Sequence, residues 1–152
     1  MRRRLLSPWL TVRAQFVLAA FFVVAGIAKV ADPPGFAHEI HNYALLPAAL
    51  INPMALVLPW LEIVAGVALF LGIATQTTAR ILAFLLVVFI GALSINLAKG
   101  KPVDCGCFGG PAVPKTAAER LFDMKLAIAR DVGLLLLAGQ ILASQREELR
   151  RR

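Results

Sequence analysis

The sequence predicts an all-α integral membrane protein built as a bundle of four antiparallel helices. Of its 152 residues, 59% are apolar and the mean hydropathy is +0.77, whereas an average soluble domain is about 45–50% apolar. Only 16% of the residues are charged, and they gather at the two ends and in two loops. The uncharged stretches between them are longer than a soluble core of this size can bury.

Four apolar stretches, residues 14–30, 48–72, 79–98 and 121–143, are the expected membrane spans. Crossing a hydrocarbon layer of ~30 Å takes about 20 helical residues. The first stretch ends at Asp32-Pro33-Pro34, where paired prolines stop a helix. The alternative interpretation of this stretch is a cleaved signal peptide. Because Lys29 stands where a small-residue cleavage site belongs, we predict a retained span.

The connections and the small residues complete the expected fold. Pro47, Pro53 and Pro59 predict a kinked or partly irregular start to the second span. Residues 38–43 are too short and polar to cross, so an interfacial helical turn is expected there. Small residues in spans allow close helix approach, which predicts tight packing at Gly26, Gly66, Gly72 and Gly91. Without internal repeats, the chain reads as one domain, residues 1–152.

The positive charges predict the orientation in the membrane. The net charge is +7, but seven arginines lie in the terminal segments 2–4 and 146–152, which fits membrane topology better than nucleic-acid binding. Residues 31–47, in contrast, contain no Lys or Arg. We therefore expect both termini in the cytoplasm, a location in the inner membrane, and loop 99–120 on the outer, oxidising side, although four basic residues in that loop oppose this orientation.

Several polar side chains fall within the apolar spans and need partners. An unpaired charge at mid-bilayer costs at least ~2.5–3.5 kcal/mol. Glu62 and Arg130 lie at similar expected depths, which predicts an ion pair between them. Adjacent helical residues point about 100° apart, so Asp131 is expected to pair with Lys29 or Asn96 instead of Arg130. Such a network serves either helix packing or a polar floor for redox or proton movement.

The motif Cys105-Gly106-Cys107 is the part of the sequence that points to chemistry. A disulfide needs Cα atoms about 4.4–6.8 Å apart, so joining these cysteines requires a turn, which glycine permits. A strained, exposed disulfide exchanges more readily than a structural one. Redox exchange, a static disulfide and metal binding all remain open at this point.

Two further readings compete with redox exchange. His38 and His41 lie three residues apart in the other outer loop, so a metal site shared with the two cysteines is conceivable, although the spacing matches no known zinc module and no metal site is expected. The other hypothesis is a membrane scaffold or anchor subunit in which the two cysteines form a static disulfide that stabilises the loop. The residues leave open whether the chain is itself an enzyme.

The ordered motifs resemble the MauE branch of the DoxX-like membrane proteins over nearly the whole chain. These motifs are Ala25-Gly26-Ile27-Ala28-Lys29, Tyr43-Ala44-Leu45-Leu46-Pro47, Pro59-Trp60-Leu61-Glu62 with Gly66, Asp104-Cys105-Gly106-Cys107-Phe108-Gly109, and Arg130-Asp131. The resemblance implies four helices and an accessory role in methylamine utilisation. That role is exercised beside a thioredoxin-like extracytoplasmic partner, in maturing a disulfide-rich periplasmic dehydrogenase subunit.

One cysteine pair limits the route that electrons can take. Membrane dithiol relays commonly use two pairs, whereas this chain has Cys105 and Cys107 alone. Electrons must therefore leave to a partner thiol on the same side or to a non-protein acceptor such as a quinone. No haem or flavin motif is evident, and no cofactor is assigned by the residues themselves.

Overall fold

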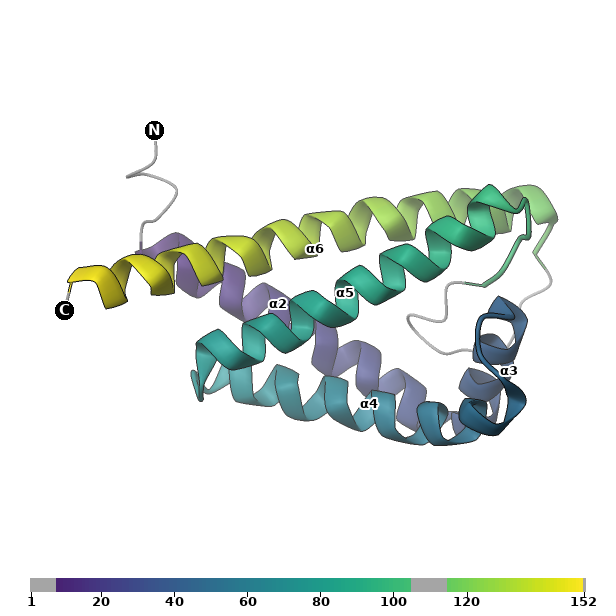
Figure 1. Cartoon of the computed structure of the whole chain (residues 1–152), viewed down its shortest axis with the longest axis horizontal. Coiled ribbons are helices and arrows are strands. Elements are labelled where there is room, and N and C mark those ends of the chain that lie inside the picture. The colour runs from purple at the N-terminus through teal and green to yellow at the C-terminus, as the bar shows by residue number, and fades with distance from the viewer. Residues whose placement is uncertain (1–7, 105–114, 152) are drawn as a thin grey trace.

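The computed structural model describes residues 8–104 and 115–151, and in these ranges it contains four long helices and one short one (Figure 1). The long helices are α2 (Pro8–Ala31), α4 (Ala48–Phe70), α5 (Thr75–Ala98) and α6 (Ala117–Arg151). Each is long and apolar enough to cross a membrane. The predicted all-α bundle of four spans is confirmed.

The helix bounds depart from the expected ones mainly at the two ends of the chain. Helix α2 begins at Pro8 and α6 continues to Arg151. At 1.5 Å per residue, the 35 residues of α6 are longer than a ~30 Å hydrocarbon layer. Its last turns, which carry Arg146 and Arg150, extend past the other helices (Figure 1). The hydropathy pattern found the apolar part of α6 but not this polar extension.

The segment Asp32-Pro33-Pro34 ends one helix and starts the next. Helix α2 ends at Ala31, as predicted, and α3 (Pro33–Tyr43) follows at once. The Asp32 side chain caps α3 by accepting a hydrogen bond of 3.1 Å from the Gly35 amide. Prolines fit the first turn because its amides lack helical partners. Helix α3 thus includes the expected turn at 38–43 but begins five residues earlier.

Of the kinked or partly irregular start predicted for the second span, the irregular alternative is wrong. Helix α4 is continuous from Ala48, with Pro53 and Pro59 inside it and Pro47 as its extended N-cap residue. A proline inside a helix leaves the carbonyl four residues earlier without its donor. For Pro59 this residue is Ala55, which is buried. Protein therefore shields the freed carbonyl from lipid, the condition under which prolines are tolerated in a span.

Helices α2 and α4 have the most extensive contact of any two helices described, and α5 packs mainly on α6. A Cβ on Gly26 would lie 2.6 Å from the Ile63 side chain, and one on Gly66 would lie 2.8 Å from that of Val23. The predicted close approach is confirmed at these two glycines. A Cβ on Gly91 would meet nothing within 4 Å, so the expected tight packing there is wrong.

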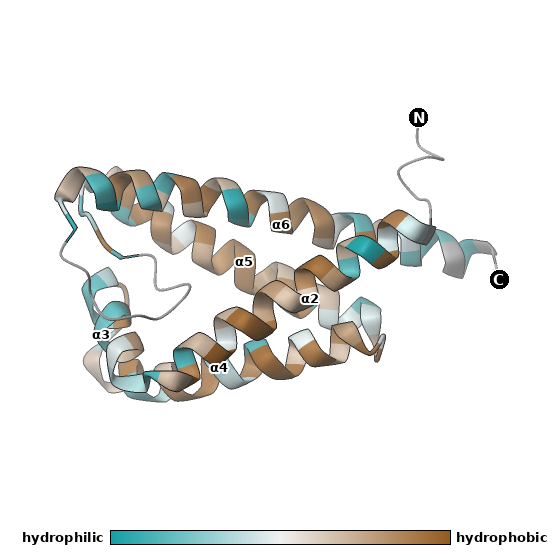
Figure 2. Ribbon diagram, turned by 180° about the vertical axis from the view of Figure 1, so that it is seen from behind, coloured by the Kyte–Doolittle hydropathy of each residue, from teal (hydrophilic) through white to brown (hydrophobic). Residues whose placement is uncertain are grey.

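The bundle has two apolar cores at different levels along its axis. The larger core joins all four long helices toward the end where α2 begins and α6 stops, and the smaller one contains Leu93, Val103, Met124 and Ala127. Large apolar side chains such as Val64 and Leu136 remain exposed, and hydrophobic residues occur along all four long helices (Figure 2). A lipid environment accommodates such a surface. Helix α3 lies at the other end of the bundle, away from the start of α2 and the C-terminal end of α6 (Figure 1).

Candidate functional site: a charged cluster inside the helix bundle

Lys29 and Glu62 form an ion pair between α2 and α4. The Lys29 ammonium lies 2.7 and 2.8 Å from the two carboxylate oxygens of Glu62, and the side chains are only 3% and 1% exposed. The same ammonium lies 4.8 Å from the centre of the Phe89 ring and 5.2 Å from that of Phe36. Cation–π attraction therefore adds to the charge pairing.

Arg130 and Asp131 form a second pair within α6. The Nε and Nη2 atoms of Arg130 lie 3.0 and 2.8 Å from Asp131 Oδ1. Asp131 is buried, whereas the Arg130 side chain is 27% exposed. The guanidinium group lies over the Phe21 ring at 4.8 Å. Arg130 thus bridges a buried carboxylate and an aromatic ring of α2.

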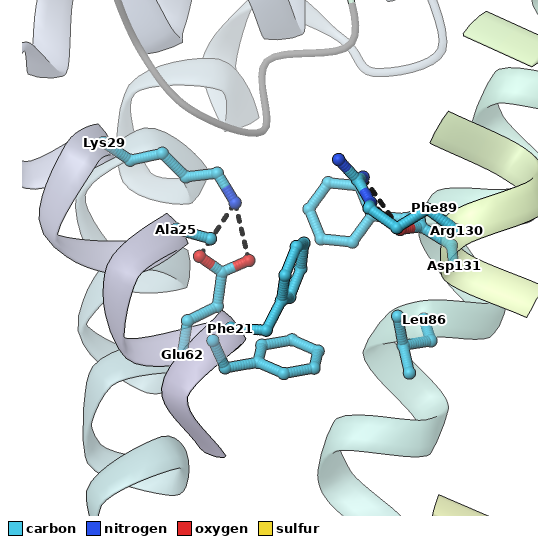
Figure 3. A pocket seen from close by; sticks show the side chains of 9 residues that line it. Phe21, Ala25, Lys29, Glu62, Leu86, Phe89, Arg130 and Asp131 are labelled. Atoms are coloured by element: carbon cyan, nitrogen blue, oxygen red, sulfur yellow. Dashed lines mark hydrogen bonds and ion pairs between the residues drawn. The ribbon is translucent and has the colours of Figure 1, made fainter. Parts of the chain in front are cut away.

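Both pairs line one small cavity (Figure 3). The space open to water centres is about 20 Å³, and a volume of about 10–15 Å³ suffices for one water molecule. Lys29 and Arg130 enter from opposite walls, with aromatic rings between them. The four charged groups sum to zero, as expected. The cavity can hold a hydrogen-bonded water between the buried Lys29–Glu62 pair and the partly buried Arg130–Asp131 pair.

The predicted Glu62–Arg130 pair is wrong because the helices that carry these residues are not neighbours. Helix α2 packs on both α4 and α6, and α4 and α6 occupy opposite sides of the bundle (Figure 1). Equal depth along the axis therefore does not bring their side chains together. Since side chains point back toward the start of their helix, Lys29 near the end of α2 reaches down to Glu62.

The expected partners of Asp131 are also wrong. Arg130 is its ion-pair partner, because the long arginine side chain can fold back although adjacent Cβ atoms diverge. Lys29 is the ion-pair partner of Glu62 instead. Asn96 is buried, but its amide nitrogen donates to the carbonyls of Tyr43 and Ala92 at 3.3 and 3.1 Å. Asn96 therefore joins α5 to the end of α3 instead of joining the charged cluster.

The sequence reasoning missed the aromatic residues around the two cations. Phe21, Phe36 and Phe89 come from α2, α3 and α5. Phe36 carried a usable signal, because it is a large apolar residue in a short helix that also contains His38, Glu39, His41 and Asn42. Phe21 and Phe89 lie in uniformly apolar spans, where an aromatic residue gives no such signal.

Cys105 and Cys107 lie outside the described residues, but both flanks of their segment are described. Before it, Val103 is buried in the smaller core, and Asp104 lies 3.8 Å from Arg120 of α6. After it, the Thr116 amide and hydroxyl donate to Glu119 at 2.7 and 2.9 Å, and the Glu119 amide returns a hydrogen bond of 3.3 Å. This reciprocal cap begins α6. Both flanks are thus anchored to the same end of the bundle.

His38 and His41 are exposed on α3. Among residues 8–104 and 115–151, no group of three or more His, Cys, Asp or Glu side chains is placed to hold a metal ion. This statement does not extend to a site that includes Cys105 or Cys107, because both lie outside the described residues.

The profile of the family described as "Methylamine utilisation protein MauE" matches residues 7–144. The chain belongs to the MauE family. The MauE protein of Methylorubrum extorquens is 33% identical over 88% of this chain and 69% of its own length. That of Methylophilus methylotrophus is 32% identical over 69% of this chain and 56% of its own. Protein TlpB of Flavobacterium psychrophilum is 28% identical over 88% of this chain and 38% of its own length.

The MauE match covers α2, α4 and α5, α6 as far as residue 144, and both pairs of the charged cluster. With its four apolar helices, this MauE-family chain is a multi-pass membrane protein. The chain spans a little over half the length of some of the MauE relatives it matches. No solved structure matches the chain.

Proposed function

We propose that this protein is a membrane accessory component of thiol–disulfide handling, with Cys105 and Cys107 as the exchanging pair. The proposal places it in the inner membrane, with both termini in the cytoplasm and the cysteines on the outer face, working with a thioredoxin-like partner. The observation that carries it is the C-x-C pair between two anchored flanks, Asp104 against Arg120 and the Thr116 cap. Both described flanks of the segment contact the start of α6.

The chemistry is exchange through a mixed disulfide. A partner thiolate attacks the disulfide formed by Cys105 and Cys107, so that one cysteine becomes bonded to the partner and the other leaves as a thiolate. A second partner thiolate then displaces the bound cysteine. The partner gains a disulfide, and the chain keeps the two electrons as its dithiol. The reverse sequence reduces the partner.

Membership of the MauE family supports a biological setting for this exchange. The relatives carry the name methylamine utilization protein, so the proposed client is a disulfide-containing protein of methylamine metabolism outside the cytoplasm. The competing scaffold reading keeps the same fold but makes the cysteines a static loop staple.

Trapping distinguishes exchange from a staple. In Cys107→Ser, a mixed disulfide formed at Cys105 lacks its resolving thiol and should accumulate, and Cys105→Ser provides the reciprocal test. The captured protein is identified by mass spectrometry after non-reducing electrophoresis, with the double serine variant as the control. An exchanging pair should also have a reduction potential near −120 to −270 mV when it is equilibrated in glutathione buffers. Absence of a covalent adduct in both single variants, with a midpoint below about −300 mV, favours the staple.

Sidedness has its own test. A membrane-impermeant thiol reagent should label the reduced cysteines in intact spheroplasts, since the arginine-rich ends predict a cytoplasmic location for both termini. Labelling only after the membrane is opened would overturn the orientation and the compartment on which the exchange depends.

A further inference from the structure

A large apolar pocket lies beside the charged cluster, between α3, α4 and α5. Its volume is about 480 Å³, within the ~300–1,000 Å³ of typical small-molecule sites. Four aromatic side chains line it, namely Phe36, Tyr43, Phe84 and Phe89. A flat, mostly apolar ring system matches such walls, because aromatic rings pack by offset stacking or edge-to-face contact.

Two aromatic rings join the pocket to the charged cluster. Phe36 and Phe89 line the pocket, and both lie close to the Lys29 ammonium, at 5.2 and 4.8 Å from ring centre to nitrogen. Phe89 also lines the small cavity that contains the two ion pairs. An occupant of the apolar pocket is therefore separated from Lys29 and Glu62 by little more than these rings.

One wall of the pocket also adjoins the smaller apolar core. Tyr43 lines the pocket and packs against the smaller apolar core, which contains Val103. Cys105 follows Val103 by two positions in the sequence. Val103, two positions before Cys105 in the sequence, thus belongs to the core that adjoins this wall of the pocket.

We infer that this pocket binds a lipid-soluble quinone, which accepts the electrons of the Cys105–Cys107 dithiol. The inference rests on the proposed thiol–disulfide function for its electron donor. A single cysteine pair that oxidises a partner must itself be reoxidised, and the chain contains no second pair to do so. An acceptor dissolved in the bilayer can reach a pocket between membrane-spanning helices.

The lining charges favour a quinone over a phospholipid. Among the described residues that line the pocket, none is Lys or Arg, and the charged one is the acidic Glu39. A phosphate group would find no cation there and would be repelled by the Glu39 carboxylate. An uncharged quinone avoids this repulsion.

The redox step balances without another reactant. Two S–H bonds break, the Cys105–Cys107 disulfide forms, and two electrons and two protons convert the two quinone carbonyls into hydroxyls. The resulting hydroquinone leaves to the bilayer, and the disulfide is again available to oxidise a partner dithiol.

Binding is tested with decylubiquinone on the purified full-length protein in phospholipid nanodiscs, with bound quinone quantified by extraction. Val88→Trp places a large side chain in the pocket lining, and Val64→Trp makes the same change at an exposed position outside it. Because an overfilled site excludes its ligand, Val88→Trp should weaken binding by about tenfold or more, and Val64→Trp should not. Ala92→Leu is a milder filling variant should Val88→Trp fail to assemble.

Equal quinone binding by both tryptophan variants, or retention of phospholipid alone by the parent, would overturn the inference. The double variant Cys105→Ser/Cys107→Ser separates the two proposals. It should bind decylubiquinone like the parent but no longer form hydroquinone. If the parent binds quinone at this pocket but never forms a mixed disulfide with a partner, the proposed function fails and the quinone site stands. If mixed disulfides form but quinone does not bind, the quinone site fails and the proposed function stands.

Discussion

Two ion pairs of nearly equal length occupy very different surroundings in this protein. Lys29–Glu62 spans 2.7 Å with side chains 3% and 1% exposed, and Lys115–Asp123 spans 2.6 Å with side chains 43% and 35% exposed. Removing one partner of a buried pair leaves a charge without water or a counter-ion, whereas water replaces the lost partner of an exposed pair. Solvent access, and not distance, therefore decides how much the protein depends on each pair.

Replacing Glu62 with Gln should have the largest effect of the changes considered. It leaves the Lys29 ammonium buried between Phe36 and Phe89 without a counter-charge, and breaking a buried pair typically costs ~3–5 kcal/mol. The yield of folded protein and its thermal midpoint in detergent measure this loss. The double variant Lys29→Met/Glu62→Met removes both charges and should recover much of the stability. A Glu62→Gln protein as stable as the parent would mean that the buried pair contributes little.

Asp131→Asn should destabilise the protein less than Glu62→Gln. The change leaves Arg130 without its carboxylate, but Arg130 is 27% exposed and keeps its contact with Phe21. Loss of a charged hydrogen-bond partner costs about 1–3 kcal/mol. Thermal unfolding of the two single variants, measured side by side, should rank them in this order. The reverse ranking would show that α6 depends on its internal pair more than α2 and α4 depend on theirs.

Gly26→Ala tests whether close backbone approach holds the buried pair together. The added Cβ would lie 2.6 Å from Ile63 Cγ1 and 2.9 Å from the Pro59 carbonyl oxygen, so α2 must move away from α4, at a cost of about 1–3 kcal/mol. Gly91→Ala is the matched control, since its Cβ meets nothing within 4 Å. Denaturant titration should show a loss for Gly26→Ala alone. Equal stability of the two variants would contradict the role assigned to Gly26.

Lys115→Met should have the smallest effect. Its pair with Asp123 is partly exposed, and such pairs contribute about 0–1 kcal/mol, less at high salt. Repeating the thermal measurement at low and high salt checks this, because Lys29–Glu62 should be insensitive to salt over the same range. A loss for Lys115→Met as large as that for Glu62→Gln would remove the distinction between the two pairs.

The sequence predicted which polar side chains gather better than it predicted their partners. Lys29, Glu62, Arg130 and Asp131 all line one cavity, as their positions within or at the ends of apolar spans indicated. The assignment of Glu62 to Arg130 failed because depth is readable from residue counts, whereas helix neighbourhood is not. Asn96, near the end of α5, bonds instead to the end of α3.

The sequence by itself determined the number of spans, their approximate ends and the turn at Asp32-Pro33-Pro34, because the bilayer and the proline ring act on local stretches of chain. Only the tertiary structure decided that α2 packs between α4 and α6, that Lys29 reaches Glu62, and that Phe36 and Phe89 lie between the charged cluster and an apolar pocket. Uniformly apolar helices carry no pattern that marks their partners. Their arrangement depends on surface shape, such as the close approach at Gly26 and Gly66, and on which buried charges can meet.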